Sequence, residues 1–166
     1  LVQQVAADPT LDPWAVLAPG FELATPYYLN LAPNYDATVT PRVMTKRGLQ
    51  LAGEFRYLMT DYSGQLNAED LPRDHVTGTN RYAFAFRHTH NLQRLLPGLV
   101  GYLNLNKVSD DTYFVDLSDR VALTSLTTLP REGGLSYANG PWSVVARAQA
   151  FQTLQGDFFV GEVSDH

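Results

Sequence analysis

Two histidines have the type and spacing that a metal site requires. His88 and His90 lie two positions apart, which places both imidazoles on one face of a strand. Zinc needs at least one further protein ligand, and no nearby cluster supplies it. The alternative is a pair of histidines that face solvent or a wet interior near a strand end. We predict neither a metal nor another cofactor.

A second candidate group combines one carboxylate with several cations. Glu54 and Arg56 share a strand face, and Arg42 has the same parity on the preceding strand. A carboxylate among cations can act as a general acid or base. In a membrane barrel the inward face is polar, and such side chains line a hydrated lumen or pair across strands. We therefore interpret Arg42, Glu54, Arg56 and Arg87 as lumen candidates and predict no catalytic residue.

Common catalytic motifs are missing. The chain contains no G-x-S-x-G, phosphate-binding glycine loop or H-E-x-x-H motif. Tyr27, Tyr28 and Tyr57 offer a platform for a sugar ring, and aromatic residues of a membrane interface or of a core are the alternative.

The elements that position these residues are strands. Between 49 and 59, Leu, Leu, Gly, Phe, Tyr and Met take every second position, and polar residues take most of the others. This period of two is typical of a strand with one apolar and one polar face. Short breaks between such segments indicate hairpins, so we expect an all-β, antiparallel up-and-down meander. Its eight expected strands cover about 21–32, 37–46, 49–60, 65–71, 81–89, 99–108, 125–137 and 142–153, with a loop at 72–80 and a short helix or loop within 109–126.

The orientation of the faces separates three functional hypotheses. In a membrane barrel, Leu51, Phe55 and Phe84 face acyl chains, whereas Arg56 and Arg87 face a wet interior. A soluble lipocalin-like barrel with an apolar ligand requires the inverse arrangement. A small outer-membrane enzyme that modifies lipid requires a Ser/His or His/carboxylate site at one rim.

Two prolines interrupt alternating segments. Pro26 lies in the first expected strand and Pro41 in the second. Proline has no N–H to donate to a ladder, so strands that contain it pair weakly and lie at edges or bulges. One interpretation is therefore a pair of bulges that shape the strands.

Composition limits the class of protein. The 166 residues suffice for one domain, and 17% are charged against 45% apolar. The net charge of −5 argues against nucleic-acid binding. The absence of cysteine excludes disulfides and thiolate metal sites. No apolar run approaches the roughly 20 residues of a membrane helix, and residues 1–20 lack a signal-peptide pattern, so we expect a mature segment.

Several motifs carry a family resemblance. The segment TPYYLNLAPNYDATVTP, the following KRG and EFRYL, and the later LNLNKVSDDTYFVDLSD occur in this order. They resemble the N-terminal part of the barrel domain of the LPS-assembly outer-membrane protein family (LptD, or organic solvent tolerance). The resemblance covers about 21–155. It leaves 1–20 as a non-matching segment or linker and 156–166 as a non-matching tail.

The resemblance implies a function. The family forms outer-membrane β-barrels of Gram-negative bacteria that insert lipopolysaccharide into the outer leaflet, without enzymatic activity. It implies as partners lipopolysaccharide, a plug lipoprotein, periplasmic components of the LPS bridge, and outer-membrane lipid. Pro26 and Pro41 stand in the matching TPYY and TVTP motifs and imply a lateral gate at the first strands. The eight strands either close as a small barrel or form part of a larger one.

Overall fold

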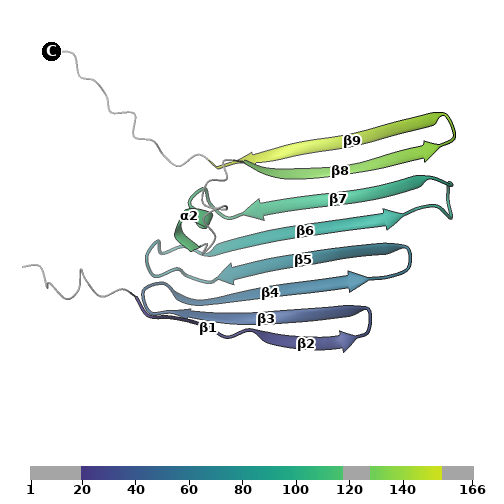
Figure 1. Ribbon diagram of the computed structural model, residues 1–166. Helices are drawn as coiled ribbons and strands as arrows, with labels where there is room; N and C mark the ends of the chain where they lie inside the picture. The colour runs from purple at the N-terminus through teal and green to yellow at the C-terminus, as the bar shows by residue number, and fades with distance from the viewer. Residues whose placement is uncertain (1–19, 118–127, 155–166) are drawn as a thin grey trace, which may run out of the picture.

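The computed structural model describes residues 20–117 and 128–154, which form a single antiparallel sheet with one short helix (Figure 1). The strands lie side by side in one layer, and the helix α2 lies at one end of them. The elements are β1 (Glu22–Ala24), β2 (Tyr27–Ala32), β3 (Tyr35–Met44), β4 (Gly48–Leu58), β5 (Tyr62–Leu71), β6 (Arg81–Asn91), β7 (Leu99–Val108), α2 (Tyr113–Leu117), β8 (Thr128–Asn139) and β9 (Trp142–Thr153).

The topology is a meander. From β3 onward each strand pairs with the next, and both β1 and β2 pair with β3. Within the described residues the sheet is open, with β1 and β2 along one edge and β9 along the other. The predicted antiparallel meander is confirmed, but it has nine strands where we expected eight. The first expected strand, 21–32, is divided at Thr25 and Pro26.

Some expected boundaries were wrong. The fourth strand was expected only from 65, after a turn at 61–64, but β5 begins at Tyr62 and Ser63 already pairs with Leu58. The segment expected as a helix or a loop contains α2. Residues 118–127, and the segments 1–19 and 155–166 at the chain ends, lie outside the described residues.

The register divides the sheet into two faces. Alternation places apolar side chains of all the strands from β3 to β9 on one face, because directly paired residues point the same way. We call this the apolar face; its members include Val39, Leu51, Phe55, Leu66, Phe84, Phe86, Leu103, Leu135 and Val144. The opposite, polar face includes Asp36, Glu54, Arg56, Gln65, Asn67, Arg87, Asn104, Glu132, Arg147 and Gln149.

Few side chains of the apolar face are buried by other described residues. Leu51 is 51% exposed and Phe84 39% exposed, and neither belongs to the buried core. That core lies at the α2 end of the sheet and consists of Met44, Leu71, Val108, Tyr113, Leu117, Leu129 and Leu154. In the described ranges, no helix has the length and apolar character needed to cross a bilayer.

Candidate functional site: the polar face and the proline edge

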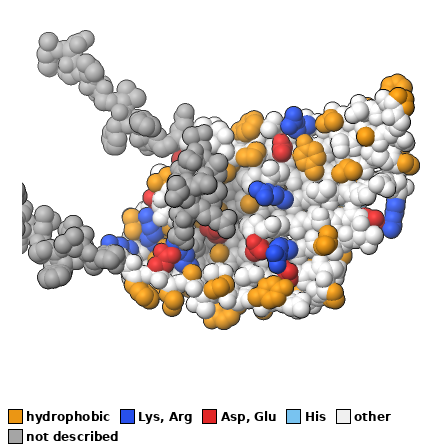
Figure 2. Space-filling view, in the orientation of Figure 1, with side chains coloured by type: hydrophobic (Ala, Val, Ile, Leu, Met, Phe, Trp, Pro, Cys, Tyr) orange, Lys and Arg blue, Asp and Glu red, His pale blue; other side chains and the backbone are white. Residues whose placement is uncertain are grey.

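A row of polar side chains crosses the sheet from β3 to β9. The row has seven residues, one from each strand, and each pairs directly with the next across neighbouring strands. Their side chains therefore point to the same side of the sheet. Figure 2 shows the basic and acidic side chains of this face as separate patches on an otherwise mostly uncharged surface. In strand order, the row consists of Asp36, Arg56, Gln65, Arg87, Asn104, Glu132 and Gln149.

Arg56 pairs with carboxylates on the polar face. Its Nε and Nη2 donate to the two carboxylate oxygens of Asp36, both at 2.9 Å. Tyr28 donates its hydroxyl to the same carboxylate at 3.3 Å. Glu54 lies 3.4 Å from Arg56 Nε and accepts a hydrogen bond from Gln65 at 2.9 Å. The structure therefore brings Glu54 and Arg56 together on β4, in a network that reaches Asp36 on β3 and Gln65 on β5.

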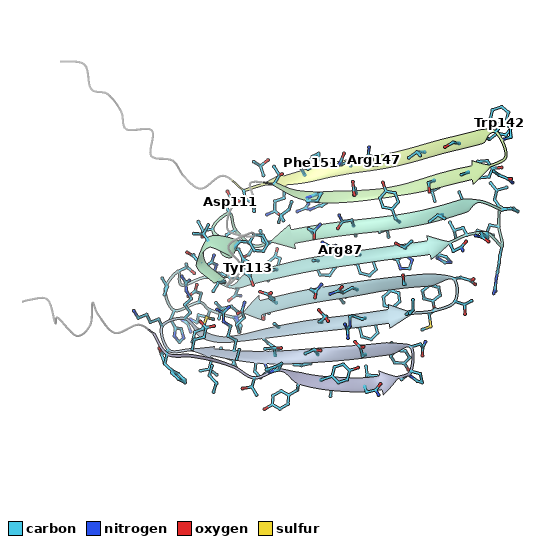
Figure 3. All side chains as sticks on the ribbon, in the orientation of Figure 1. Arg87, Asp111, Tyr113, Trp142, Arg147 and Phe151 are labelled. Carbon is cyan, nitrogen blue, oxygen red and sulfur yellow. The ribbon has the colours of Figure 1, made fainter. Side chains whose placement is uncertain are left out.

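Arg42 lies apart from this network and contacts α2. Its guanidinium pairs with Glu22, and Nη1 donates to the carbonyl of Leu117 at 2.7 Å and to Gln50 at 3.3 Å. The last carbonyls of a helix lack intrahelical partners, so Arg42 satisfies one of them. Arg87, by contrast, points from the middle of β6 and is exposed (Figure 3). The four predicted lumen residues thus share one face but do not form one site.

The most buried polar cluster was missing from the sequence prediction. Arg81, 1% exposed, donates bidentately to Asp110 at 2.9 and 2.7 Å and contacts Asp116 at 2.8 Å. It also contacts Asp74, which is fully buried and accepts from Arg47 at 2.6 Å. These contacts join the 45–47 turn, the 72–80 loop, β6 and the α2 segment.

The cluster lowers the pKa values of two of its carboxylates. Burial raises the pKa of Asp74, but the Val76 N–H and the guanidinium of Arg47 outweigh it, so the pKa lies below its ordinary value. Burial likewise opposes ionisation of Asp110, and hydrogen bonds from Arg81 and Ser109 lower its pKa. Both carboxylates are therefore ionised at neutral pH.

Tyr113 fastens α2 to the polar face. Its hydroxyl donates to Glu69 at 2.7 Å and accepts from Gln50 at 3.0 Å. Burial, followed by the neighbouring Glu69 carboxylate, raises the pKa of Tyr113. The ring lies within the core and faces the guanidinium of Arg81 at 5.5 Å. A helix as short as α2 is not stable in an isolated peptide, so these tertiary contacts hold it in place.

The two prolines are neighbours at the β1/β2 edge. The registers on either side of the break are continuous, so Thr25 lies opposite Pro41 and Pro26 opposite Thr40. Thr25 N–H donates to the carbonyl of Pro41 at 3.1 Å. Pro41 has no N–H to donate in return, and one ladder bond between β1/β2 and β3 is missing.

Pro26 affects the other side of the same strand. Neighbouring residues in a strand direct their backbone polar groups to opposite sides. Because Thr25 faces β3, the nitrogen of Pro26 faces the open edge of the sheet. This edge therefore lacks one donor for any further strand.

By register, His88 and His90 lie on the apolar face, together with Phe84 and Phe86. His88 Nδ1 and the hydroxyl of Tyr57 are 2.6 Å apart, and the rings of His90 and Tyr62 are tilted at 47° with their centroids 5.4 Å apart. The three tyrosines considered as one platform also separate, because Tyr28 lies on the polar face and Tyr27 and Tyr57 on the other. In the described part of the chain, no carboxylate contacts either imidazole.

The fold and these surfaces define a class of protein: an antiparallel β-meander with one continuous apolar face, one polar face and a weakened edge. The model of the LptD family, described as LPS transport system D, matches residues 79–161. The chain is 51% identical over 139 residues to the LPS-assembly protein LptD of Azoarcus sp. strain BH72, which covers 83% of the chain and 17% of that protein. It is 53% identical over 138 residues to the LPS-assembly protein LptD of Paraburkholderia xenovorans, an alignment that covers 81% of the chain and 17% of that protein.

A similar protein of the same name from Chromobacterium violaceum is 48% identical over 139 residues, covering 81% of the chain and 17% of that protein. The chain belongs to the LptD family. It spans about a sixth of the length of the curated relatives that it matches.

Proposed function

We propose that this sheet is part of an outer-membrane β-barrel that moves lipopolysaccharide into the outer leaflet of a Gram-negative bacterium. The observation that carries the proposal is the separation of the two faces. The apolar face is left uncovered by the described protein, as contact with acyl chains requires. The polar face offers hydrogen bonds and charges to a saccharide. A lipocalin-like barrel would need the apolar side chains packed inward, and the exposed Leu51 and Phe84 do not support it.

Both edges of the sheet need further strands. In a bilayer, each unsatisfied backbone N–H or C=O costs several kcal/mol. The edge of β9 and the edge formed by β1 and β2 must therefore pair with other strands or with each other. The share of its relatives that the chain spans supports a larger barrel, of which residues 21–155 are the first strands.

The proline edge is the proposed lateral gate. Pro41 removes a bond between β1/β2 and β3, and Pro26 removes a donor toward the strand that closes the barrel. A typical backbone hydrogen bond contributes about 1 kcal/mol net to stability. Pro26 therefore lowers the cost of parting the first strand from the closing strand by about that amount, and Pro41 lowers the cost of detaching the first strand from β3 by a similar amount. Lipopolysaccharide can then leave sideways, with its head on the polar side and its acyl chains on the apolar side.

The remaining partners follow from the family alone. We propose that a lipoprotein plugs the barrel interior and that a periplasmic bridge delivers lipopolysaccharide to it. Residues 1–20 and 156–166 are proposed to connect the sheet with its surroundings. Transport of this kind requires no catalytic residue in the sheet.

The test restores the missing donors. In the intact protein, the double variant Pro26→Ala and Pro41→Ala is expected to slow the arrival of newly made lipopolysaccharide at the cell surface, because the first strand gains one hydrogen-bond donor toward the closing strand and one hydrogen bond to β3. Pro33→Ala, in the turn between β2 and β3, is the control and leaves the rate unchanged. Normal export by the double variant, at a normal level of assembled protein, would contradict the gate.

A further inference from the structure

The arginines of the polar face fall into two groups. Arg42, Arg56 and Arg81 each pair with at least one carboxylate. In the part of the chain that the structure describes, Arg87 on β6 and Arg147 on β9 have no acidic side chain within ion-pairing distance. Figure 3 shows these two arginines on separate strands of the sheet, away from the α2 end. Their donors are therefore available to a ligand.

An aromatic ring lies between the two unpaired arginines. Tyr102 on β7 pairs with Gly134 on β8, and Gly134 pairs with Arg147 on β9. A Cβ atom added to Gly134 would meet the Tyr102 ring at 2.6 to 2.8 Å. The ring therefore occupies the space above the glycine, on the polar face. It leans across β8 toward the strand that carries Arg147.

Arg87 lies on β6, the strand on the other side of Tyr102. Thr89, two residues after Arg87, pairs directly with Tyr102. Strand spacing places Arg87 and Arg147 about 14 Å apart across the sheet and about 7 Å apart along it. Both arginine side chains are long enough to reach inward over Tyr102. The residues paired with Arg87 are Gln65 and Asn104, whose neutral amides do not compete for its charge.

Among the described residues on the polar face of β6 to β9, one carboxylate lies beside these arginines. Glu132 pairs with Asn104 and Gln149 and accepts a hydrogen bond from Gln149 at 3.3 Å. It weakens the positive potential near Arg147 without forming an ion pair with it. Removal of this charge should therefore favour an anionic ligand.

We propose that Arg87, Tyr102 and Arg147 form a subsite for the phosphorylated amino-sugar head of lipopolysaccharide. The inference rests on the proposed function and identifies which residues of the polar face recognise the substrate. A guanidinium binds phosphate through two parallel hydrogen bonds. The face of an aromatic ring carries negative potential and attracts the C–H groups of a sugar ring. Two unpaired guanidiniums on either side of a ring match a sugar head with phosphate at each end.

The arginines that already pair with carboxylates are less suited to bind phosphate than Arg87 and Arg147. A phosphate that binds Arg56 must first displace the bidentate carboxylate of Asp36. Arg87 occupies the same row of the sheet and binds phosphate without such an exchange. The subsite therefore lies over β6 to β9 and not over the proline edge.

The test compares two probes on the intact, folded protein in detergent: diphosphoryl lipid A and the same lipid with both phosphates removed. Dissociation constants are measured by calorimetry, and the ratio of the two affinities reports phosphate recognition. We expect Arg87→Gln and Arg147→Gln each to lower this ratio about tenfold, the loss of one charge-assisted contact. Arg94→Gln removes the same charge from the exposed loop between β6 and β7 and leaves the ratio unchanged.

Further variants separate recognition from folding. Arg87→Lys retains most of the ratio because it keeps the charge, Glu132→Gln raises it, and Tyr102→Leu weakens both probes alike. An unchanged ratio in both arginine-to-glutamine variants, or equal binding of the two probes by the unaltered protein, overturns the subsite and leaves the proposed function standing. Failure of the unaltered protein to bind either probe overturns both.

Discussion

Thr25 donates its backbone N–H to the carbonyl of Pro41 at 3.1 Å, and Pro41 returns no hydrogen bond. This hydrogen bond joins the short break between β1 and β2 to β3. The sheet is thus continuous in register but lacks a ladder bond where two prolines meet. The two prolines act on opposite sides of one strand, so their effects can be measured separately.

Pro41→Ala is expected to stabilise the first strand within the chain. The new N–H lies opposite the Thr25 carbonyl, and one added hydrogen bond contributes about 1 kcal/mol. Hydrogen exchange of the β1 amides should slow about fivefold. Pro26→Ala should produce such slowing only where another strand pairs with the open edge. Equal protection from both variants, in a form whose edge is unpaired, would contradict this assignment.

Arg81→Met is expected to be severely destabilising. Breaking a buried ion pair by removing one partner costs about 3–5 kcal/mol because the remaining charges lose their compensation. Here Asp110 and Asp116 lose their principal cation, whereas Asp74 retains Arg47. The free energy of unfolding in urea measures the effect. A loss below about 1 kcal/mol would show that the cluster contributes little.

Arg56→Gln provides the contrasting case. Its guanidinium is half exposed and pairs with Asp36 at the surface of the polar face. Exposed ion pairs are screened by water and contribute little to stability, so the same urea titration should show a far smaller change than for Arg81→Met. A loss as large as that of Arg81→Met would mean that the polar face is less hydrated than we propose.

Acid should release α2 from the sheet. The pKa values of Asp74 and Asp110 are lowered in the folded protein, so their contribution to stability is complete above the ordinary carboxyl pKa of about 4. It is lost as the pH falls from there through the lowered values. A spin label at the exposed Val115 should therefore become mobile only below about pH 4, and a label at Leu95 should not change. Release near pH 6 would point to another titrating group.

The two faces of the sheet could be predicted from the sequence because side chains alternate between the faces along every strand, and this alternation is visible within each strand's own residues. The period of two around Leu51 and Phe55, and around Phe84 and Phe86, places these side chains on the face that the structure shows. The break in the first strand was harder to predict, because Pro26 by itself is equally compatible with a bulge.

The Arg81 cluster could not be predicted in the same way. Asp74, Asp110 and Asp116 lie in segments without alternation, and their meeting depends on how two loops fold over one end of the sheet. The consecutive Asp110 and Asp111, followed by Tyr113, were the available signal, but local periodicity does not show which cation they approach. Similarly, Arg87 and Arg56 look alike in sequence and differ only in the partner that the register supplies.

The orientation of the two faces can be measured directly with spin labels along β6 in a bilayer. Labels at Phe84 and Phe86 should be accessible to oxygen dissolved in the lipid, and labels at Ala83 and Ala85 to a water-soluble nickel reagent, in strict alternation. This result would place the apolar face in lipid and Arg87 toward water. The inverse alternation, or equal access at all four positions, would contradict the account.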